Sequence, residues 1–389
     1  MKHATRTLAR QTLHAARAAL ALGASVWLSA TPLTAHADEH GLLETIHRHS
    51  TLINTVPDNG DQNPYAIAVV PVSSGALKAG DVLVDNFNNA SNLQGTGSTI
   101  VDYHPDTKQM TLFAAIPRDL KACPGGVGLS TAMTVLKSGW VVVGSTPSND
   151  GTTNTKGAGC LVVLDNHGKV AGTLSSAKIN DPWGNMAVVD DGDHAALFVS
   201  NAGFGVGGAD GNPPVVKQAT ILRLDLDIAD GQPPRVKNET VIASGFGAQA
   251  DKGAFLVGPT GLALSADHKQ LYVSDAIGNR VNVIDDPLTR DTSAGVGRQL
   301  TADGLLHRPL AMVTTPQGHL LVTNALNGQV VEIDAATGKQ LYARWIDADK
   351  AQSPPGSGDL FGLAMTPAGD GFYYVEDDMN ALVLAQRAQ

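Results

Sequence analysis

With 42 Gly and 20 Pro but only 5% aromatic residues, this chain of 389 residues has the composition of a turn-rich β protein. Its 27 Lys and Arg face 37 Asp and Glu, and the resulting net charge of −10 disfavours binding to nucleic acid or to anionic lipid. No apolar run after residue 37 is long enough to cross a bilayer, so we expect no membrane insertion.

The first 37 residues resemble a secretory signal peptide. A basic segment (residues 2–17) without acidic residues is followed by a short apolar run (residues 18–28) and then by Ala35-His36-Ala37, a small-x-small cleavage site. We therefore expect cleavage after Ala37. The mature protein, residues 38–389, should be periplasmic or secreted.

One pattern recurs along the rest of the chain. Each copy has a first strand of small and apolar residues, a turn, a β-branched second strand that ends in a polar residue, and a third strand that ends near Asp. The six copies have first strands that begin near Tyr65, Leu129, Trp183, Gly258, Arg308 and Phe361. Turns such as residues 334–339 lead into a fourth strand, and four antiparallel strands make one propeller blade. The repeat predicts an all-β fold, a six-bladed β-propeller with four-stranded blades.

The two ends of this pattern complement each other. The last copy stops at Gln389 after three strands, whereas a spare strand, Ser50 to Val56, precedes the first copy. Adding the spare strand to the last blade would pair both open edges. We expect this N-terminal strand to close the ring of a single domain.

The copy around Gly261 carries a family resemblance. Gly261-Leu-Ala263, Tyr272-Val-Ser-Asp275 and Asn279-Arg-Val281 resemble the repeat of the NHL family of β-propellers, and the other five copies match more loosely. This resemblance implies a fold and little about activity. The gluconolactonase family, similar in fold, holds a divalent metal in its channel through Asn or Asp directly before the Gly of some first strands. This chain has Thr260, Trp183 and Phe361 at the corresponding places.

Functional residues are expected on one face of the ring. The loops before the first strands and those between second and third strands open on the same face, called here the top face, and three of the latter are long: 87–97, 146–159 and 202–219. Cys123 and Cys160 both fall there, and export favours a disulfide over two buried thiols. Because long loops on a rigid scaffold often carry function, we expect a monomer that binds a small molecule or a protein at this face.

Several polar residues are candidate ligand contacts. The second strands end at Asn86, Ser145, Asn201, Asp275, Asn324 and Asp377. These residues either converge on the channel as oxygen ligands for a divalent cation such as Ca²⁺ or bind the backbone of their own blade. Trp183 is a further candidate, and His307 and Arg308 at the entrance to a first strand are candidates for an anionic ligand. Most other histidines, His319 among them, should lie in turns at the bottom face, so no zinc cluster is expected.

Three functions remain open. The chain has no Gly-x-Ser-x-Gly motif of a serine hydrolase, and Gly203–Gly208 matches a dinucleotide motif but is followed by Pro213-Pro214, where no helix can start. The first candidate is a ligand-binding or partner-binding propeller without assigned catalysis. The second is a metal-dependent hydrolase or lyase acting on a lactone, ester or sugar derivative, and the third is an envelope scaffold.

Overall fold

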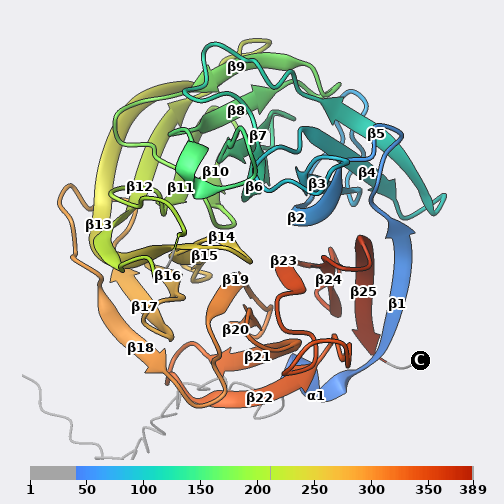
Figure 1. Cartoon of the computed structure of the whole chain (residues 1–389), viewed down its shortest axis with the longest axis vertical. Helices are drawn as coiled ribbons and strands as arrows, with labels where there is room; N and C mark the ends of the chain where they lie inside the picture. Colours follow the sequence, from blue (N-terminus) through green and yellow to red (C-terminus); the bar gives the residue numbers. More distant parts are fainter. Residues whose placement is uncertain (1–40, 211, 388–389) are drawn as a thin grey trace, which may run out of the picture. The chain divides into compact units, whose positions relative to one another are not determined.

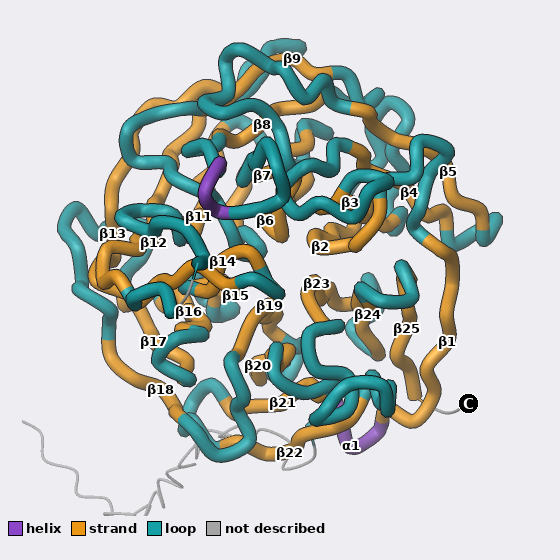
Figure 2. The backbone as a smooth tube through the Cα atoms, in the orientation of Figure 1, coloured by secondary structure: helices purple, strands orange, loops and turns teal. Residues whose placement is uncertain are grey.

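The computed structural model describes residues 41–210 and 212–387, so the expected signal peptide and its cleavage site lie outside the described residues. These residues form six small antiparallel sheets arranged in a ring (Figure 1). Figure 2 shows that helix is confined to two short segments, α1 (Leu42–Thr45) and a 3-10 turn at Thr153–Thr155. The six-bladed β-propeller predicted from the repeat is therefore confirmed. No helix in the described part of the chain is long and apolar enough to span a membrane.

Each blade runs outward from the centre of the ring. Blade 1 contains β2 (Gln62–Val69), β3 (Val82–Asn88), β4 (Thr99–His104) and β5 (Gln109–Ala115). Blade 2 contains β6 (Leu129–Val135), β7 (Val141–Ser145), β8 (Cys160–Leu164) and β9 (Val170–Leu174). Blade 3 contains β10 (Ala187–Asp190), β11 (His194–Asn201), β12 (Val216–Asp227), β13 (Arg235–Asp251) and β14 (Phe255–Val257).

The other three blades follow the same plan with four strands each. Blade 4 contains β15 (Pro259–Leu264), β16 (Gln270–Asp275), β17 (Arg280–Asp285) and β18 (Arg298–Ala302). Blade 5 contains β19 (Pro309–Thr314), β20 (His319–Asn324), β21 (Gln329–Asp334) and β22 (Gln340–Trp345). Blade 6 contains β23 (Leu360–Met365), β24 (Gly371–Glu376), β25 (Ala381–Arg387) and β1 (Ile46–Asn54).

Blade 6 is built from both ends of the chain, as the spare strand predicts. β1 pairs antiparallel with β25, with Ser50 opposite Leu384, and the blue and dark red strands lie side by side in Figure 1. The strand spans Ile46–Asn54 rather than residues 50–56, because the pairing with β25 extends back to Arg387. Through this pairing β25 has a hydrogen-bonded strand on each side, and β1 becomes the outer strand of blade 6.

Blade 3 departs from the predicted pattern. Its fourth strand, β13, runs on to Asp251, and the chain then turns back into a fifth strand, β14. Phe246, Ala248 and Ala250 alternate with more exposed neighbours, the period expected of a half-buried strand. The β13–β14 hairpin brings the segment after Asp251 to the centre of the ring, beside β15 (Figure 1).

The glycines of the repeat mark places where neighbouring blades meet. A Cβ atom at Gly261 would lie 2.4 Å from the carbonyl oxygen of Leu310, and one at Gly184 would lie 1.5 Å from that of Thr260. Ser274 Oγ donates a hydrogen bond to the same Leu310 oxygen across the blade boundary. Only a residue without a side chain fits such a contact. The glycine of the Gly261-Leu-Ala263 motif is therefore explained by close packing between neighbouring blades.

The segment that precedes β1 is fixed by a buried carboxylate of blade 5. Glu332 accepts hydrogen bonds from the backbone N–H groups of Leu42 and Leu43, each at 2.8 Å, and contacts His319 Nδ1 at 2.8 Å. The expectation of a turn position for His319 is wrong, because the residue opens β20 and its ring is buried against Glu332.

Candidate functional site

A cavity of about 200 Å³ lies where the blades converge. Its walls come from blades 2 to 6, and most of the blade 3 side is formed by the end of β13, the turn that follows it and β14. The main apolar lining residues are Trp183, Leu256, Val257, Leu310, Leu326 and Phe361. Because most of these side chains are apolar, the cavity suits a ligand that buries hydrocarbon surface.

Five aromatic side chains cluster beside this cavity. Tyr65 and Phe361 stack at 3.8 Å between ring centroids, Phe87 meets Trp183 edge to face at 5.7 Å, and Trp183 and Phe255 lie 6.3 Å apart. The residues come from blades 1, 3 and 6, so the cluster joins distant parts of the chain. Interlocked rings of this kind hold one another in fixed orientations, which gives the cavity a rigid aromatic wall.

The register of the first strands explains why these rings face inward. In every blade a residue in the first strand or just before it pairs with a residue near the end of the second strand, as Pro259 pairs with Asp275 and Leu360 with Glu376. The residue that follows this pairing position is Tyr65, Ser130, Trp183, Thr260, Leu310 or Phe361. Four of the six line the cavity. The same register, applied to the sequence, would have revealed an apolar centre.

The charged group at the cavity is an ion pair. Arg308 Nη1 lies 3.2 Å from Asp251 Oδ2, and the two side chains are 29% and 28% exposed. Arg308 has a left-handed backbone (φ 58°), and its N–H donates to Asn279 Oδ1 at 2.9 Å. A half-exposed pair of this kind contributes at most about 1 kcal/mol to stability, so its exchange for a ligand contact costs little. The structure thus places two candidates, Arg308 and Trp183, in the cavity wall.

The polar ends of the second strands bind nearby backbone. Asn86 Nδ2 donates to the carbonyl oxygen of Thr55, and Asn201 Oδ1 accepts from the N–H of Asn180, each at 3.0 Å. None of the six residues at the second-strand ends lines the cavity. Thr55 and Asn180 lie in the segments that lead into blades 1 and 3, so each side chain binds the backbone that enters its blade and not that of the blade's own strands.

Two further members of this set are engaged in the same way. Asp275 accepts a hydrogen bond from the N–H of Gly278 and forms an ion pair with Arg280 at 2.9 Å. Asn324 Oδ1 accepts from the backbone N–H of His307 at 3.0 Å. The His307 side chain is not among the residues that line the cavity, although its neighbour Arg308 is.

Blade 6 shifts the last candidate by one residue. Glu376, rather than Asp377, pairs with the first strand, and Asp377 lies just beyond the end of β24. There it lines a second, polar cavity of about 300 Å³ together with Asn63, Asn88 and Asn380. Burial, and then the neighbouring Asp378, raise the pKa of Asp377 to about 7.

The residues of the central cavity do not fit a channel metal of the gluconolactonase type. Two of the three expected ligand positions are aromatic, and the hydroxyl of the third, Thr260, donates to the carbonyl oxygen of Gly258. Asp251 is the one carboxylate among the described lining residues, and Arg308 already pairs with it. A divalent cation needs several oxygen ligands, which this lining does not supply.

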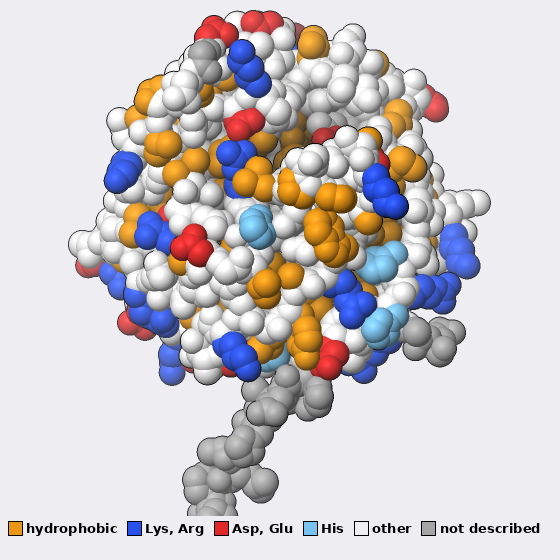
Figure 3. All heavy atoms as spheres, turned by 60° about the horizontal axis from the view of Figure 1, so that its bottom comes forward, with side chains coloured by type: hydrophobic (Ala, Val, Ile, Leu, Met, Phe, Trp, Pro, Cys, Tyr) orange, Lys and Arg blue, Asp and Glu red, His pale blue; other side chains and the backbone are white. Residues whose placement is uncertain are grey.

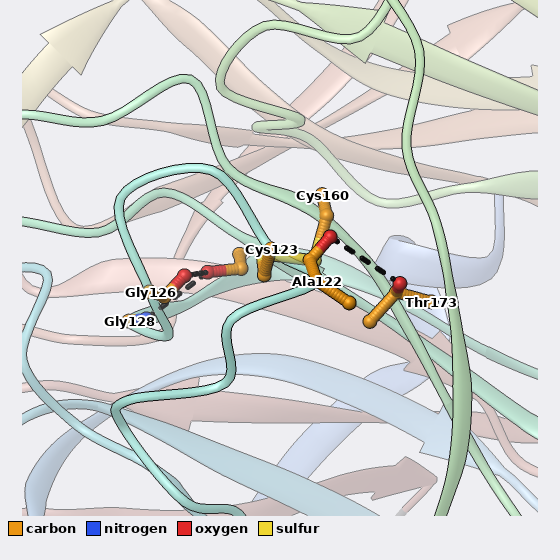
Figure 4. Close-up of a disulfide and its surroundings, with 7 residues drawn as sticks. Ala122, Cys123, Gly126, Gly128, Cys160 and Thr173 are labelled. Carbon is orange, nitrogen blue, oxygen red and sulfur yellow. Dashed lines mark hydrogen bonds between the residues drawn. A yellow bond between two sulfur atoms is a disulfide. The ribbon is translucent and has the colours of Figure 1, made fainter.

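The top face of blade 2 carries the predicted disulfide. Cys123 and Cys160 are bonded with a Cα–Cα distance of 5.2 Å, joining the loop before β6 to the start of β8 (Figure 4). Ser145 Oγ accepts from the N–H of Gly128 and donates to the carbonyl oxygen of Gly126, both at 3.1 Å. The loop is therefore fixed both covalently and by hydrogen bonds.

Comparison with known proteins supports the fold. No protein-family model matches the chain, and no curated protein matches its sequence. Among solved structures, a gluconolactonase from Xanthomonas campestris aligns with 14% identity, 90% of this chain, 93% of that chain and a TM-score of 0.56. A luciferin-regenerating enzyme aligns with 14% identity, 87% and 95% coverage and a TM-score of 0.52. The calcium-binding protein regucalcin from Agrobacterium tumefaciens aligns with 11% identity, 86% and 94% coverage and a TM-score of 0.50.

These likenesses are to propellers of the gluconolactonase type, and at such low identities they show the fold alone. The NHL-like repeat remains a resemblance of the sequence. These likenesses assign no activity to this chain.

Proposed function

We propose that this protein is a ligand-binding propeller that holds a small, mainly apolar molecule in its central cavity, without assigned catalysis. The observation that carries the proposal is the cavity itself, with its aromatic wall of Trp183 and Phe361 and one ion pair, Arg308–Asp251. Small-molecule sites are typically apolar hollows with a few polar groups that fix orientation. A carboxylate on the ligand could take the place of Asp251 beside Arg308, so apolar acids are the preferred class.

The same proposal includes the setting in which the protein works. After cleavage following Ala37 it would be a periplasmic or secreted monomer, and the Cys123–Cys160 disulfide supports this because disulfides persist outside the reducing cytosol. In the view of Figure 3, hydrophobic side chains are interspersed with charged and polar ones. On the face that this view shows, the mixture favours a small molecule over a large apolar protein partner.

The test is a binding screen on residues 38–389. Thermal unfolding is measured with aromatic and aliphatic carboxylic acids and with their neutral amides, and intrinsic fluorescence reports contact with Trp183. We expect acids with an apolar body to raise the unfolding temperature and to change the fluorescence. Arg308→Gln should weaken the acids about tenfold, the value of one charge-assisted hydrogen bond, while leaving the amides unaffected.

Two tryptophan variants complete the design. Trp183→Phe should abolish the fluorescence response, whereas Trp140→Phe, in blade 2 away from the cavity lining, should preserve it. Binding that survives both Arg308→Gln and Trp183→Phe would place the ligand elsewhere and refute the proposal.

A metal-dependent hydrolase of the lactonase type is the second candidate, supported by the likeness in fold to gluconolactonase. It predicts lactone hydrolysis that EDTA removes and a divalent metal restores. Such an activity, if lost on substitution of the cavity residues, would replace the binding proposal.

A further inference from the structure

Three carboxylates from separate segments meet at the top face of blade 6. Asp347 follows β22, Asp359 precedes β23, and Asp378 lies in the turn between β24 and β25. One carboxylate oxygen from each lies within 4.8 Å of the others. The N–H of Asp377 donates to the carbonyl oxygen of Asp359, which holds the turn against the loop. The grouping is thus built by the fold, since the residues are not neighbours in sequence.

The buried members of this group have unsatisfied oxygens. The Asp347 and Asp359 side chains are buried, at 4% and 5% exposure, and the Oδ2 atom of each has no hydrogen-bond partner. Gln352 Oε1, in the loop that joins them, is also buried without a partner. Desolvated polar atoms of this kind cost free energy unless a positive charge or a donor compensates them.

No basic side chain supplies that compensation. In the described part of the chain, no Lys, Arg or His forms an ion pair with any of the three carboxylates. Buried carboxylates are normally paired with a cation or coordinated to a metal. The missing partner is therefore expected to come from outside the chain.

We propose that Asp347, Asp359 and Asp378 bind a calcium ion, with Gln352 Oε1 as a further ligand. Calcium takes six to eight oxygen ligands at about 2.3–2.6 Å, so two oxygens on one ion lie up to about 5 Å apart, which accommodates the spacing of these carboxylates. All the protein donors are oxygens, as a hard cation requires. Magnesium is less suitable, because it usually binds through one or two carboxylates and keeps several waters.

The site has a consequence for the neighbouring cavity. The loop between Asp347 and Asp359 contributes Ser357 and Gly358 to the wall of the central cavity. An ion that joins both ends of this loop to the β24–β25 turn would restrict the loop's motion. The cation would thus order one wall of the cavity, although its ligands Asp347, Asp359 and Asp378 are not among the residues that line the cavity.

A second cluster provides a matched control. Asp81, Asp102 and His104 in blade 1 also bring three ligand atoms together, and Asp81 and Asp102 are buried. There, however, His104 Nδ1 contacts Asp81 Oδ2 at 3.0 Å, so the chain supplies its own partner. Substitutions in this cluster should leave calcium binding unchanged.

The experiment measures cation binding directly on EDTA-treated residues 38–389. Calcium should raise the unfolding temperature, and terbium, a luminescent substitute, should be sensitised by Tyr374, whose hydroxyl donates to the carbonyl oxygen of Ile346 next to Asp347. Added calcium should displace terbium, with a dissociation constant of about 10⁻⁵ to 10⁻³ M.

Variants then locate the ion. Asp359→Asn and Asp378→Asn should each abolish the calcium-induced stabilisation and the terbium signal, whereas Asp102→Asn should retain both. Because each substitution at the site removes repulsion between carboxylates, the metal-free variants should be at least as stable as the metal-free wild type, which excludes misfolding as the cause. The proposal is overturned if the wild type shows no calcium-dependent stabilisation, or if both variants retain it.

Discussion

Loss of the Cys123–Cys160 disulfide should destabilise the propeller by an amount that follows from its loop length. The bridge joins residues 37 positions apart. In the chain-entropy relation, opening a loop of this size returns about 13 cal/mol/K to the unfolded chain, or about 4 kcal/mol at 25 °C. Replacing both cysteines with alanine also removes two buried sulfur atoms from the core of blades 1 and 2, which adds a smaller loss.

The assay is urea unfolding of three samples: oxidised wild type, wild type with reductant present throughout, and the Cys123→Ala/Cys160→Ala variant. The reduced wild type keeps both sulfurs, so its difference from the oxidised protein isolates the loop term. The variant adds the packing term. We expect losses of about 4 kcal/mol and slightly more, respectively.

A difference of less than about 1 kcal/mol between reduced and oxidised wild type would refute this reasoning. It would mean that the segment between the cysteines stays compact in the unfolded chain even without the bridge. Unchanged circular dichroism of the reduced protein in the absence of urea serves as the control that it begins from the native fold.

Three other predictions concern the buried and titrating groups. Glu332→Ala leaves two buried backbone N–H groups unpaired and should lower the free energy of unfolding by about 3 kcal/mol, with Glu332→Gln losing less; urea unfolding distinguishes them. Gly184→Ala should be more damaging than Gly172→Ala, since a Cβ at Gly172 meets nothing within 4 Å; equal unfolding temperatures would contradict the packing role of the repeat glycine. Burial, followed by the nearby carboxylates, raises the pKa of Asp359 to about 8 from 3.8, so the folded state holds a proton that the unfolded chain has released. Metal-free protein should therefore lose stability as pH rises from about 4 to about 8, and a rise in unfolding temperature over that range in EDTA would be contrary evidence.

The repetition of the sequence is what made the fold predictable. Each blade must pair the same strands and approach its neighbour at the same point, so Gly261 and Ser274 occur at positions that other copies repeat. The closing strand was predictable because the last copy has only three strands and one spare strand precedes the first copy. The register was harder to predict at the end of blade 6, where Glu376 and Asp377 are adjacent acidic residues. Only the pairing of Leu360 with Glu376 distinguishes them.

The central site was predictable only in part. Trp183 and Arg308 stand at first-strand entrances, which the repeat identifies, and both line the cavity. Asp251 and Leu256 could not be placed, because the β13–β14 hairpin that carries them has no counterpart in the other copies. The calcium site was missed for a related reason. Its residues lie in a loop and a turn that the strand pattern does not position.

The pairing of β1 with β25 also sets the order in which the protein can be completed. Five blades consist of consecutive residues and can assemble as the chain is synthesised, but the sixth waits for the final strand. Until β1 and β25 pair, each presents unpaired main-chain donors and acceptors to other chains. A fragment that lacks β1 or β25 would keep this unpaired strand edge. We therefore expect aggregation to be a more sensitive sign of an incomplete chain than the loss of any single contact within a blade.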